Sequence, residues 1–194
     1  MFVTAPENAK TLENLLTAFE GESNAAAKYT AFAAKADEDG WNGAASLFRA
    51  AARAEQIHAS NHAHVIKQLG GEAKCAIHTV EINTTLENLK IALAGENYEI
   101  DTMYPGFLKE AVEQKKSSVI RTFKYALEAE KSHSRLYGEA IALVESGNKD
   151  SWVSKERDFY VCPVCGYTSE DPKELERCPV CNARFEKAEY EVVR

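Results

Sequence analysis

The sequence contains no run of about eighteen apolar residues, which is the length that a helix needs to cross a bilayer. The first residues, Met1-Phe2-Val3-Thr4, lack the basic and apolar regions of a secretion signal. The glycines nowhere form the Gly-x-Gly-x-x-Gly motif of dinucleotide-binding proteins. We therefore expect a soluble, cytoplasmic protein that binds no nicotinamide dinucleotide itself.

Positive charge is also scarce. The chain holds 23 basic and 30 acidic residues, and its net charge of −7 argues against nucleic acid or anionic membrane as partners. Its 194 residues suffice for one ordinary domain and a small one, and a hydrophobic content of 45% excludes a disordered chain. The excess acid serves either solubility or a cluster of metal-binding carboxylates.

Cysteine is rare, and four of the five cysteines are clustered. They form the units Cys162-Pro-Val-Cys165 and Cys178-Pro-Val-Cys181, while Cys75 stands alone. In a chain without a secretion signal, paired Cys-x-x-Cys units indicate a metal site rather than disulfides. We expect a tetrahedral four-cysteine site here and a free thiol without a role at Cys75.

The spacing leaves the metal of the four-cysteine site open between iron and zinc, because zinc ribbons use similar knuckles. A rubredoxin-like iron site is favoured by the proline after the first cysteine of each knuckle, by Gly166-Tyr167, and by the aromatic residues Phe159, Tyr160 and Phe185. A domain of about 35 residues is too small for a good core of its own, so a metal would hold it together.

Before these cysteines, hydrophobic residues recur at alternating spacings of three and four, which is the pattern of amphipathic helices. We predict four helices, over residues 11–39, 42–69, 84–116 and 117–146. Glycines end the first two, and Thr84 or Thr85 caps the third. Pro105 lies inside the third helix, where its missing N–H predicts a kink or bulge.

Each predicted helix carries polar residues in the middle of its apolar stripe. Two of these interruptions read Glu-x-x-His, and residues three apart on a helix present a carboxylate and an imidazole to one point. The interrupting residues are Glu22, Glu55, His58, Glu96, Glu99, Glu130 and His133. Helices of similar length, stacked side by side, place these seven residues in one layer of the core.

The segment from Gly70 to Asn83 is long for a loop between neighbouring helices. At roughly 3.3–3.6 Å per residue it spans on the order of 45 Å, the length of a helix of about 28 residues. It either crosses the whole bundle, as in ferritin-like folds, or forms a floppy loop. We predict an all-α, ferritin-like four-helix bundle over residues 1–146, a linker over 147–158, and a rubredoxin-like four-cysteine metal domain over 159–194.

Five carboxylates cannot stay ionised in a dry core without cations, because desolvation and mutual repulsion both oppose their charge. Two divalent metals, bridged by glutamates and each bound by one imidazole, resolve this conflict. Carboxylate and imidazole ligands suit iron or manganese. Five negative charges lie between the +4 of a diferrous pair and the +6 of a diferric pair, so the surplus acid Glu99 lets the site tolerate a change of two electrons. Cleavage of the O–O bond of hydrogen peroxide also requires two electrons.

Other polar residues near this layer are expected to support it or to have no role in it. Tyr29 and Tyr104 lie where a hydroxyl reaches a ligand carboxylate, although either suits an ordinary core equally well. His62, one turn beyond His58, is expected to support the site or fill the core rather than bind metal. Glu20 is expected to be solvated.

Together, these motifs resemble those of the rubrerythrin family, over essentially the whole chain and in the usual domain order of that family. The resemblance rests on Gly21-Glu22-Ser23, Glu55-x-x-His58, Gly95-Glu96-x-x-Glu99, Met103-Tyr104-Pro105, Glu130-x-x-His133 and the Cys-Pro-x-Cys-Gly-Tyr knuckle. The chain departs from the family pattern at Glu20, an added acid, and at Ser134, where an acid is common.

The resemblance implies a non-haem di-iron peroxidase that reduces hydrogen peroxide to water in oxidative-stress defence. The seven residues of the polar layer would bind two carboxylate-bridged irons, with Tyr29 and Tyr104 beside them. One iron would move on reduction and exchange Glu99 for His58. The four paired cysteines would bind a third iron, which passes electrons to the di-iron site across a homodimer or higher homo-oligomer. An external NAD(P)H-dependent reductase would supply them.

Two alternatives remain open on the sequence alone. The bundle could oxidise or store iron as ferritins do, with a structural zinc in the cysteine domain. In the other alternative the oxidant is dioxygen, because the ligands do not rank peroxide above O2.

Overall fold

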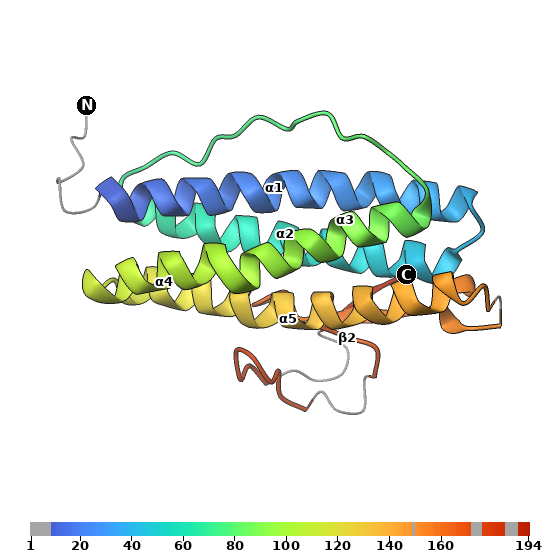
Figure 1. Ribbon diagram of the computed structural model, residues 1–194. Coiled ribbons are helices and arrows are strands. Elements are labelled where there is room, and N and C mark those ends of the chain that lie inside the picture. Colours follow the sequence, from blue (N-terminus) through green and yellow to red (C-terminus); the bar gives the residue numbers. More distant parts are fainter. Residues whose placement is uncertain (1–8, 149, 172–175, 185–189) are drawn as a thin grey trace.

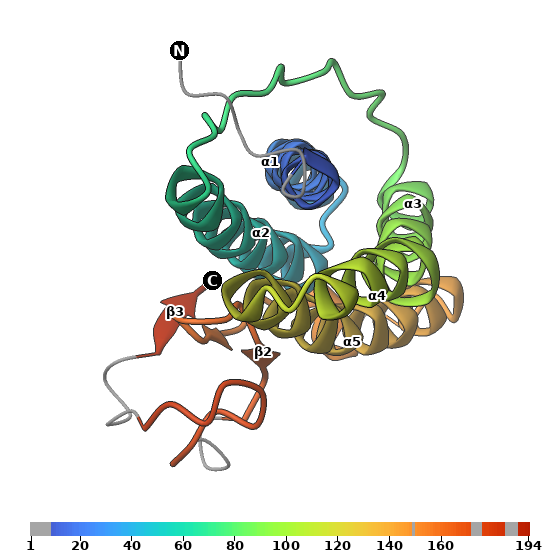
Figure 2. The ribbon, with the colours of Figure 1, turned by 90° about the vertical axis from the view of Figure 1, so that its left-hand side faces the viewer.

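Long helices lie side by side and alternate in direction (Figures 1 and 2). The structure, a computed structural model, describes residues 9–148, 150–171, 176–184 and 190–194, so Phe185, one of the aromatic residues expected beside the four cysteines, lies outside the described residues. The long helices are α1 (Ala9–Glu38), α2 (Asn42–Gln68) and α5 (Ser117–Glu145). The fourth member of the bundle is built from α3 (Thr85–Tyr98), η2 (Glu99–Met103) and α4 (Tyr104–Glu113).

The helix ends follow the signals in the sequence. Gly40 and Gly70 have φ values of 75° and 80°, a backbone region that glycine enters without steric cost, and the first two helices end just before them. Thr84 caps α3, since its hydroxyl accepts from the N–H of Glu87 while the Glu87 carboxylate accepts from the N–H of Thr84. All four predicted helical ranges are confirmed to within a few residues.

The third predicted helix is not a single α-helix. A π-helical turn, η2, separates α3 from α4, and the N–H of Tyr104 donates to the carbonyl of Glu99 five residues back. Pro105 follows directly and has no N–H to give to Asp101, the partner that an α-helix would require. The expected bulge is therefore present, and it precedes the proline as one wide turn.

The connection between α2 and α3 crosses the whole bundle. Residues 70–84 run outside α1 from one end of the molecule to the other (Figure 1). Midway, the side chain of Asn24 fixes this segment, donating to the carbonyl of Ala76 at 3.0 Å and accepting from the N–H of His78 at 2.8 Å. The ferritin-like crossing is thus confirmed, and the alternative of a floppy loop is wrong.

Two apolar clusters fill the core and leave a polar layer between them. One contains Phe32, Phe48 and Tyr137, and the other contains Leu15 and Phe123. Among the described residues, no helix is both long enough and apolar enough to span a membrane.

The cysteine-containing segment forms a small antiparallel sheet against the bundle. Its strands are β1 (Phe159–Val161), β2 (Thr168–Ser169) and β3 (Glu191–Val193), in the order β2-β1-β3. A short 3-10 helix, η3 (Trp152–Ser154), leads into them. Phe159 and Val161 join the apolar cluster of α1 and α2, so the sheet lies against the outside of the helices (Figure 2). The domain boundaries at 146 and 159 stay predictions.

Candidate metal centres

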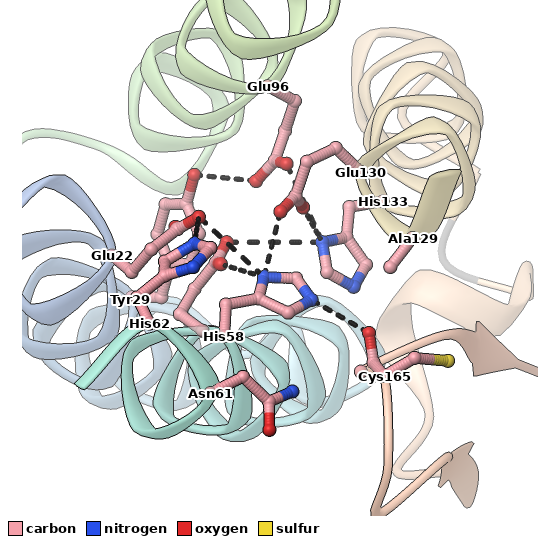
Figure 3. A network of polar contacts seen from close by, with 12 residues as sticks. Glu22, Tyr29, His58, Asn61, His62, Glu96, Ala129, Glu130, His133 and Cys165 are labelled. Carbon is pink, nitrogen blue, oxygen red and sulfur yellow. Dashed lines mark hydrogen bonds and ion pairs between the residues drawn. The ribbon is translucent and has the colours of Figure 1, made fainter. Parts of the chain in front are cut away.

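Six of the seven predicted residues meet in the middle of the bundle (Figure 3). Every helix of the bundle contributes, and the six side chains are at most 1% exposed. They form two overlapping groups whose candidate ligand atoms lie within 4.8 Å of one another. One group is Glu22, Glu55, His58 and Glu130, and the other is Glu55, Glu96, Glu130 and His133. Glu55 and Glu130 belong to both groups, as bridging carboxylates between two metals would.

The two imidazoles point the same way. His58 Nδ1 lies 2.9 Å from a Glu55 oxygen and 2.8 Å from a Glu130 oxygen. His133 Nδ1 lies 2.7 Å from the other Glu130 oxygen and 3.5 Å from Glu96. Both rings therefore turn Nδ1 to the carboxylates and Nε2 to the cysteine domain.

The contacts at Nε2 fix the form of each ring. His58 Nε2 lies 2.9 Å from the carbonyl oxygen of Cys165, which can only accept, so Nε2 carries the proton. His133 Nε2 lies 3.1 Å from the hydroxyl of Thr168, which donates its own hydrogen to the carbonyl of Gly166. In the neutral rings the lone pair is consequently on Nδ1, facing the carboxylates, which is the arrangement of a metal-binding imidazole.

The carboxylates themselves have too few partners. Both oxygens of Glu130 and one oxygen each of Glu22, Glu55 and Glu96 are buried and accept no hydrogen bond within the described residues. Since an unpaired buried carboxylate is costly, this donor set calls for cations. Carboxylate oxygens together with two imidazoles suit two iron ions.

The electrostatics of the metal-free cluster lead to the same conclusion. Burial, and then the charges of Glu130 and Glu22, raise the pKa of Glu55 well above its usual value. Burial also raises the pKa of Glu130, although His58 opposes this. For His58, burial lowers the pKa, but the neighbouring Glu130 and Glu22 outweigh it and the net shift is upward. Without metal, protons bound to Glu55, Glu130 and His58 therefore offset the negative charge that metal ions would otherwise neutralise.

Glu99 is the one predicted residue outside both groups. It is the first residue of η2 and is partly buried, and burial followed by the charges of Glu22 and Glu130 raises its pKa well above the usual value. Glu99 therefore lies close enough for the charges of the cluster to shift its pKa. The position beside the shared carboxylates Glu55 and Glu130 is occupied by His58.

Each predicted tyrosine donates to a glutamate of the other half of the bundle. The hydroxyl of Tyr29 on α1 donates to Glu96 on α3 at 2.7 Å. The hydroxyl of Tyr104 on α4 makes a short contact with Glu22 on α1. Both rings are at most 2% exposed. The tyrosines thereby orient Glu22 and Glu96, each of which belongs to only one of the two groups of candidate ligands.

The four paired cysteines converge as expected. The sulfurs of Cys162 and Cys181 are 3.7 Å apart, and those of Cys165 and Cys178 are 3.4 Å apart. A tetrahedral metal with sulfur bonds of about 2.3 Å requires sulfurs about 3.7–3.8 Å apart. Each knuckle turns through a residue of positive φ, Gly166 at 78° in the first and Asn182 at 58° in the second.

The cysteine domain contacts the bundle of its own chain beside the polar layer. Asn61 donates to the carbonyl of Val164 at 2.9 Å. Arg135 forms a bidentate ion pair with Glu170 at 2.8 and 3.0 Å, and Arg53 pairs with Glu191. The passage of electrons between subunits that the resemblance implies stays a prediction, since the structure describes one chain, in which the cysteine domain contacts its own bundle.

The remaining expectations concern residues away from the centres. Glu20 is exposed and lies 3.5 Å from His78, so the added acid does not enter the cluster. Ser134 donates to Asn97 at 2.8 Å on the outside of the bundle. Cys75 is a free thiol in the crossing segment. Sequence reasoning missed Thr122 and Thr168, because single threonines inside a stripe or after a knuckle carry no signal.

Fold and site together define a ferritin-like bundle with a buried two-metal centre, joined to a four-cysteine metal domain. Bacterioferritin of Desulfovibrio desulfuricans shares the fold, with a TM-score of 0.69 and 23% identity over 80% of this chain and 95% of that one. The sequence model for rubrerythrin matches residues 13–141, and that for the rubredoxin-like domain of rubrerythrin matches residues 160–188. The chain belongs to the rubrerythrin family.

Relatives match it over most of its length. Rubrerythrin-2 of Clostridium acetobutylicum is 38% identical, over 93% of this chain and 96% of the relative. Nigerythrin of Nitratidesulfovibrio vulgaris is 37% identical, over 88% and 81%. The solved structure of fully reduced nigerythrin superposes with a TM-score of 0.83 and 33% identity, over 94% of this chain and 86% of that one. The protein is thus an oxidoreductase of rubrerythrin type, with a di-iron site and a rubredoxin-like four-cysteine site.

Proposed function

We propose that the protein reduces hydrogen peroxide to water. The reaction takes up two electrons and two protons for each peroxide, cleaves the O–O bond and releases two waters. Two ferrous ions, when bound, supply one electron each. The seven residues of the polar layer, Glu99 included, are proposed as their ligands, and Tyr29 and Tyr104 as the residues that hold two of those carboxylates in place.

The observation that carries the proposal is the double contact of the two histidines. Each ring faces the carboxylate cluster with Nδ1 and the cysteine domain with Nε2, so both histidines connect the cluster to that domain, His58 at the backbone of Cys165 and His133 at Thr168. A metal store has no need of such a link. A catalyst that must be re-reduced after each turnover does, which favours an electron-carrying iron in the four-cysteine site over a structural zinc.

The position of Glu99 supports a second part of the proposal. The two groups of candidate ligands include His58 and leave out Glu99, which is one of the two arrangements that exchange of these ligands would require. The wide turn at η2 begins at Glu99, and π-helical turns often occur at functional sites. We propose that Glu99 enters the cluster when the metals are oxidised.

The electrons are proposed to come from a separate NAD(P)H-dependent reductase that reduces the four-cysteine site. The sequence carries no dinucleotide-binding motif of its own, which agrees with such a donor. Assembly as a homodimer or higher homo-oligomer and a cytoplasmic location stay predictions.

The test is a visible spectrum of the protein, reduced without air and then mixed with slightly more than two equivalents of peroxide. Fast return of the red bands of ferric iron in the four-cysteine site supports the proposal. A colourless protein would point to zinc and to the iron-storing alternative. Slow return with peroxide, but fast return with air, would make dioxygen the oxidant.

A variant assigns the activity to the polar layer. Glu96→Ala is expected to abolish peroxide turnover and to leave the red colour of the four-cysteine site unchanged. The matched control is Glu20→Ala, since Glu20 is an exposed acid outside the cluster, and it should turn over normally. Normal turnover in Glu96→Ala would remove the site assignment.

A further inference from the structure

His62 is buried at the edge of the polar layer but belongs to neither group of candidate ligands. Both of its nitrogens have protein partners. Nε2 lies 3.0 Å from the hydroxyl of Tyr104, and Nδ1 lies 2.9 Å from the hydroxyl of Thr122. Because Tyr104 in turn contacts Glu22, four side chains from four helices form one continuous hydrogen-bonded row, Thr122–His62–Tyr104–Glu22.

The direction of every hydrogen bond in this row follows from the carboxylate of Glu22 at its inner end. A carboxylate can only accept, so Tyr104 donates to Glu22. The oxygen of Tyr104 is then free to accept, and His62 donates to it from Nε2. That leaves the lone pair of the neutral ring on Nδ1, which accepts from the hydroxyl of Thr122. All three hydrogens therefore point inward, toward the metal centre.

The outer end of the row reaches a pocket. Thr122, itself 5% exposed, lines a pocket of about 250 Å³ together with Asn61, Arg121 and Val164. The pocket lies where α2, α5 and the first cysteine knuckle meet, and Asn61 closes one side by its bond to Val164. Its size and the polar side chains in its wall, among them Asn61, Ser118 and Arg121, suit several water molecules.

The other half of the bundle provides an internal comparison. Tyr29 donates to Glu96 just as Tyr104 contacts Glu22, but aromatic rings surround it: Phe32, Phe48 and Tyr137 lie with centroids 5.7–6.5 Å away. Among the described residues of this half, Tyr29 supports the Glu96 carboxylate without a histidine or threonine behind it, so such support requires only a tyrosine. The buried histidine and threonine behind Tyr104 need a different explanation.

We propose that Thr122, His62 and Tyr104 form the proton-entry path to the di-metal centre, with water in the pocket as the source. The proposal rests on the proposed function, because each peroxide reduced consumes two protons. In one transfer, Glu22 receives the proton of Tyr104, which takes the Nε2 proton of His62. The ring takes the proton of Thr122 at Nδ1, and Thr122 takes one from water. No member of the path gains or loses net charge. The transfer leaves the hydrogen of His62 on Nδ1, so rotation of the hydroxyls and a change of the ring back to the tautomer with hydrogen on Nε2 restore the starting arrangement.

The first test determines the direction of the hydrogen bonds in the row and does not depend on catalytic turnover. Nitrogen-15 NMR of the full chain loaded with zinc, which is diamagnetic, reports which ring nitrogen of His62 carries hydrogen. The proposal requires hydrogen on Nε2. Hydrogen on Nδ1 would reverse the bond to Thr122 and overturn the proposal, whatever the substrate of the protein is.

The second test uses a matched pair of variants in the iron-loaded protein. Thr122→Val keeps the shape of the side chain and removes the hydroxyl, whereas Thr122→Ser keeps the hydroxyl. We expect Thr122→Val to slow oxidation of the reduced centre by peroxide at least about a hundredfold, the lower end of the range for a lost proton donor, and to change its solvent deuterium isotope effect. Thr122→Ser should behave like the unaltered protein.

The outcomes separate the two proposals. If Thr122→Val reacts at the original rate, or Thr122→Ser is equally slow, the path is wrong while the peroxidase proposal stands. If the unaltered protein does not react with peroxide, the proposed function fails, and the tautomer of His62 alone decides whether the row has the required direction. Iron content and unfolding temperature, measured on both variants, show that the centre is intact.

Discussion

The imidazole Nε2 of His58 lies 2.9 Å from the carbonyl oxygen of Cys165 (Figure 3). The same ring turns Nδ1 toward Glu130, so one side chain reaches both metal centres. Because the carbonyl belongs to a residue of the four-cysteine site, the link from sulfur to the carboxylate cluster consists of one residue's backbone, one hydrogen bond and one ring. Docking of the cysteine domain and the geometry of the di-metal centre are therefore coupled.

Gly166 makes this close approach possible. Its φ of 78° disfavours any side chain, and an added Cβ would overlap His58 Nε2 and lie 3.2 Å from the carbonyl of Ala54. We expect Gly166→Ala to lower the free energy of unfolding by at least about 1–2 kcal/mol and to slow electron transfer between the centres. Stopped-flow spectra and denaturant unfolding measure the two effects.

The matched control for this variant is Gly138→Ala. Gly138 lies inside α5 with no atom near its Cβ position, so alanine there should raise stability by roughly 0.5–1 kcal/mol and leave electron transfer unchanged. Equal electron-transfer rates in both variants would show that the contact between Gly166 and His58 is not needed.

Ion pairs should make the docking of the cysteine domain sensitive to salt. Arg53 and Arg135 hold Glu191 and Glu170 across the domain junction, and all four side chains are 30–46% exposed. Such pairs contribute about 0–1 kcal/mol each and weaken as salt rises. We expect electron transfer between the centres to slow with added salt, and the double variant Arg53→Gln/Arg135→Gln to be slow at every salt concentration.

Lys131→Gln is the control, because Lys131 pairs with Glu128 within α5 and forms no ion pair with the described residues of the cysteine domain. It should keep the salt dependence of the unaltered protein. A double arginine variant that also kept this dependence would contradict the electrostatic account of docking.

The metal-free protein should lose stability as the pH rises. Burial raises the pKa of both Glu55 and Glu130 above the usual value near 4.3, so the folded state holds more protons than the unfolded state. The free energy of unfolding then falls with pH by up to about 1.4 kcal/mol per unit for each such group, from about pH 5 upward. His58, whose pKa is also raised, acts in the same direction.

Urea unfolding over about pH 5 to 8, with and without iron, measures this prediction. Glu22 does not interfere: burial opposes the shift, but His62 and His58 lower the pKa of Glu22 to about 2, so the metal-free protein at equilibrium holds no proton on Glu22 over this pH range. The iron-loaded protein should lack the slope, and Glu55→Gln should reduce it in the metal-free form. A metal-free protein that gained stability with pH would contradict the prediction.

Removal of the Tyr29 hydroxyl should weaken metal binding without unfolding the bundle. The hydroxyl donates to Glu96 at 2.7 Å, and loss of such a partner typically costs tenfold to a hundredfold in metal affinity. Competitive iron titration of Tyr29→Phe measures the loss. Tyr98→Phe, at an exposed position on α3, should bind like the unaltered protein, and equal affinities for both variants would remove the supporting role of Tyr29.

Regular features of the sequence predicted most of the fold. The spacing of three and four gives each helix, and Glu-x-x-His within such a pattern places both side chains on one face, so the convergence of Glu55, His58, Glu130 and His133 needed only equal helix lengths. The crossing segment followed from its length. These inferences work because helical periodicity is a local property of the chain.

Features that depend on contacts between distant segments could not be predicted. The domain junction sets which nitrogen of each imidazole faces the carboxylates, through Cys165 and Thr168. Docking of the cysteine domain on its own bundle depends on the course of a polar linker without periodicity. The row from Thr122 to Tyr104 joins three helices, and no spacing within one helix indicates it.

The π-helical turn bears on how similar the two halves of the bundle are. Glu22 and Tyr29 are seven residues apart, whereas Glu96 and Tyr104 are eight apart, and each tyrosine contacts the glutamate of the opposite half. The two halves therefore follow one plan, with a single residue inserted into the second, where a π-helical turn absorbs it. Glu99 opens that turn, so the extra acid and the extra residue break the symmetry at the same place.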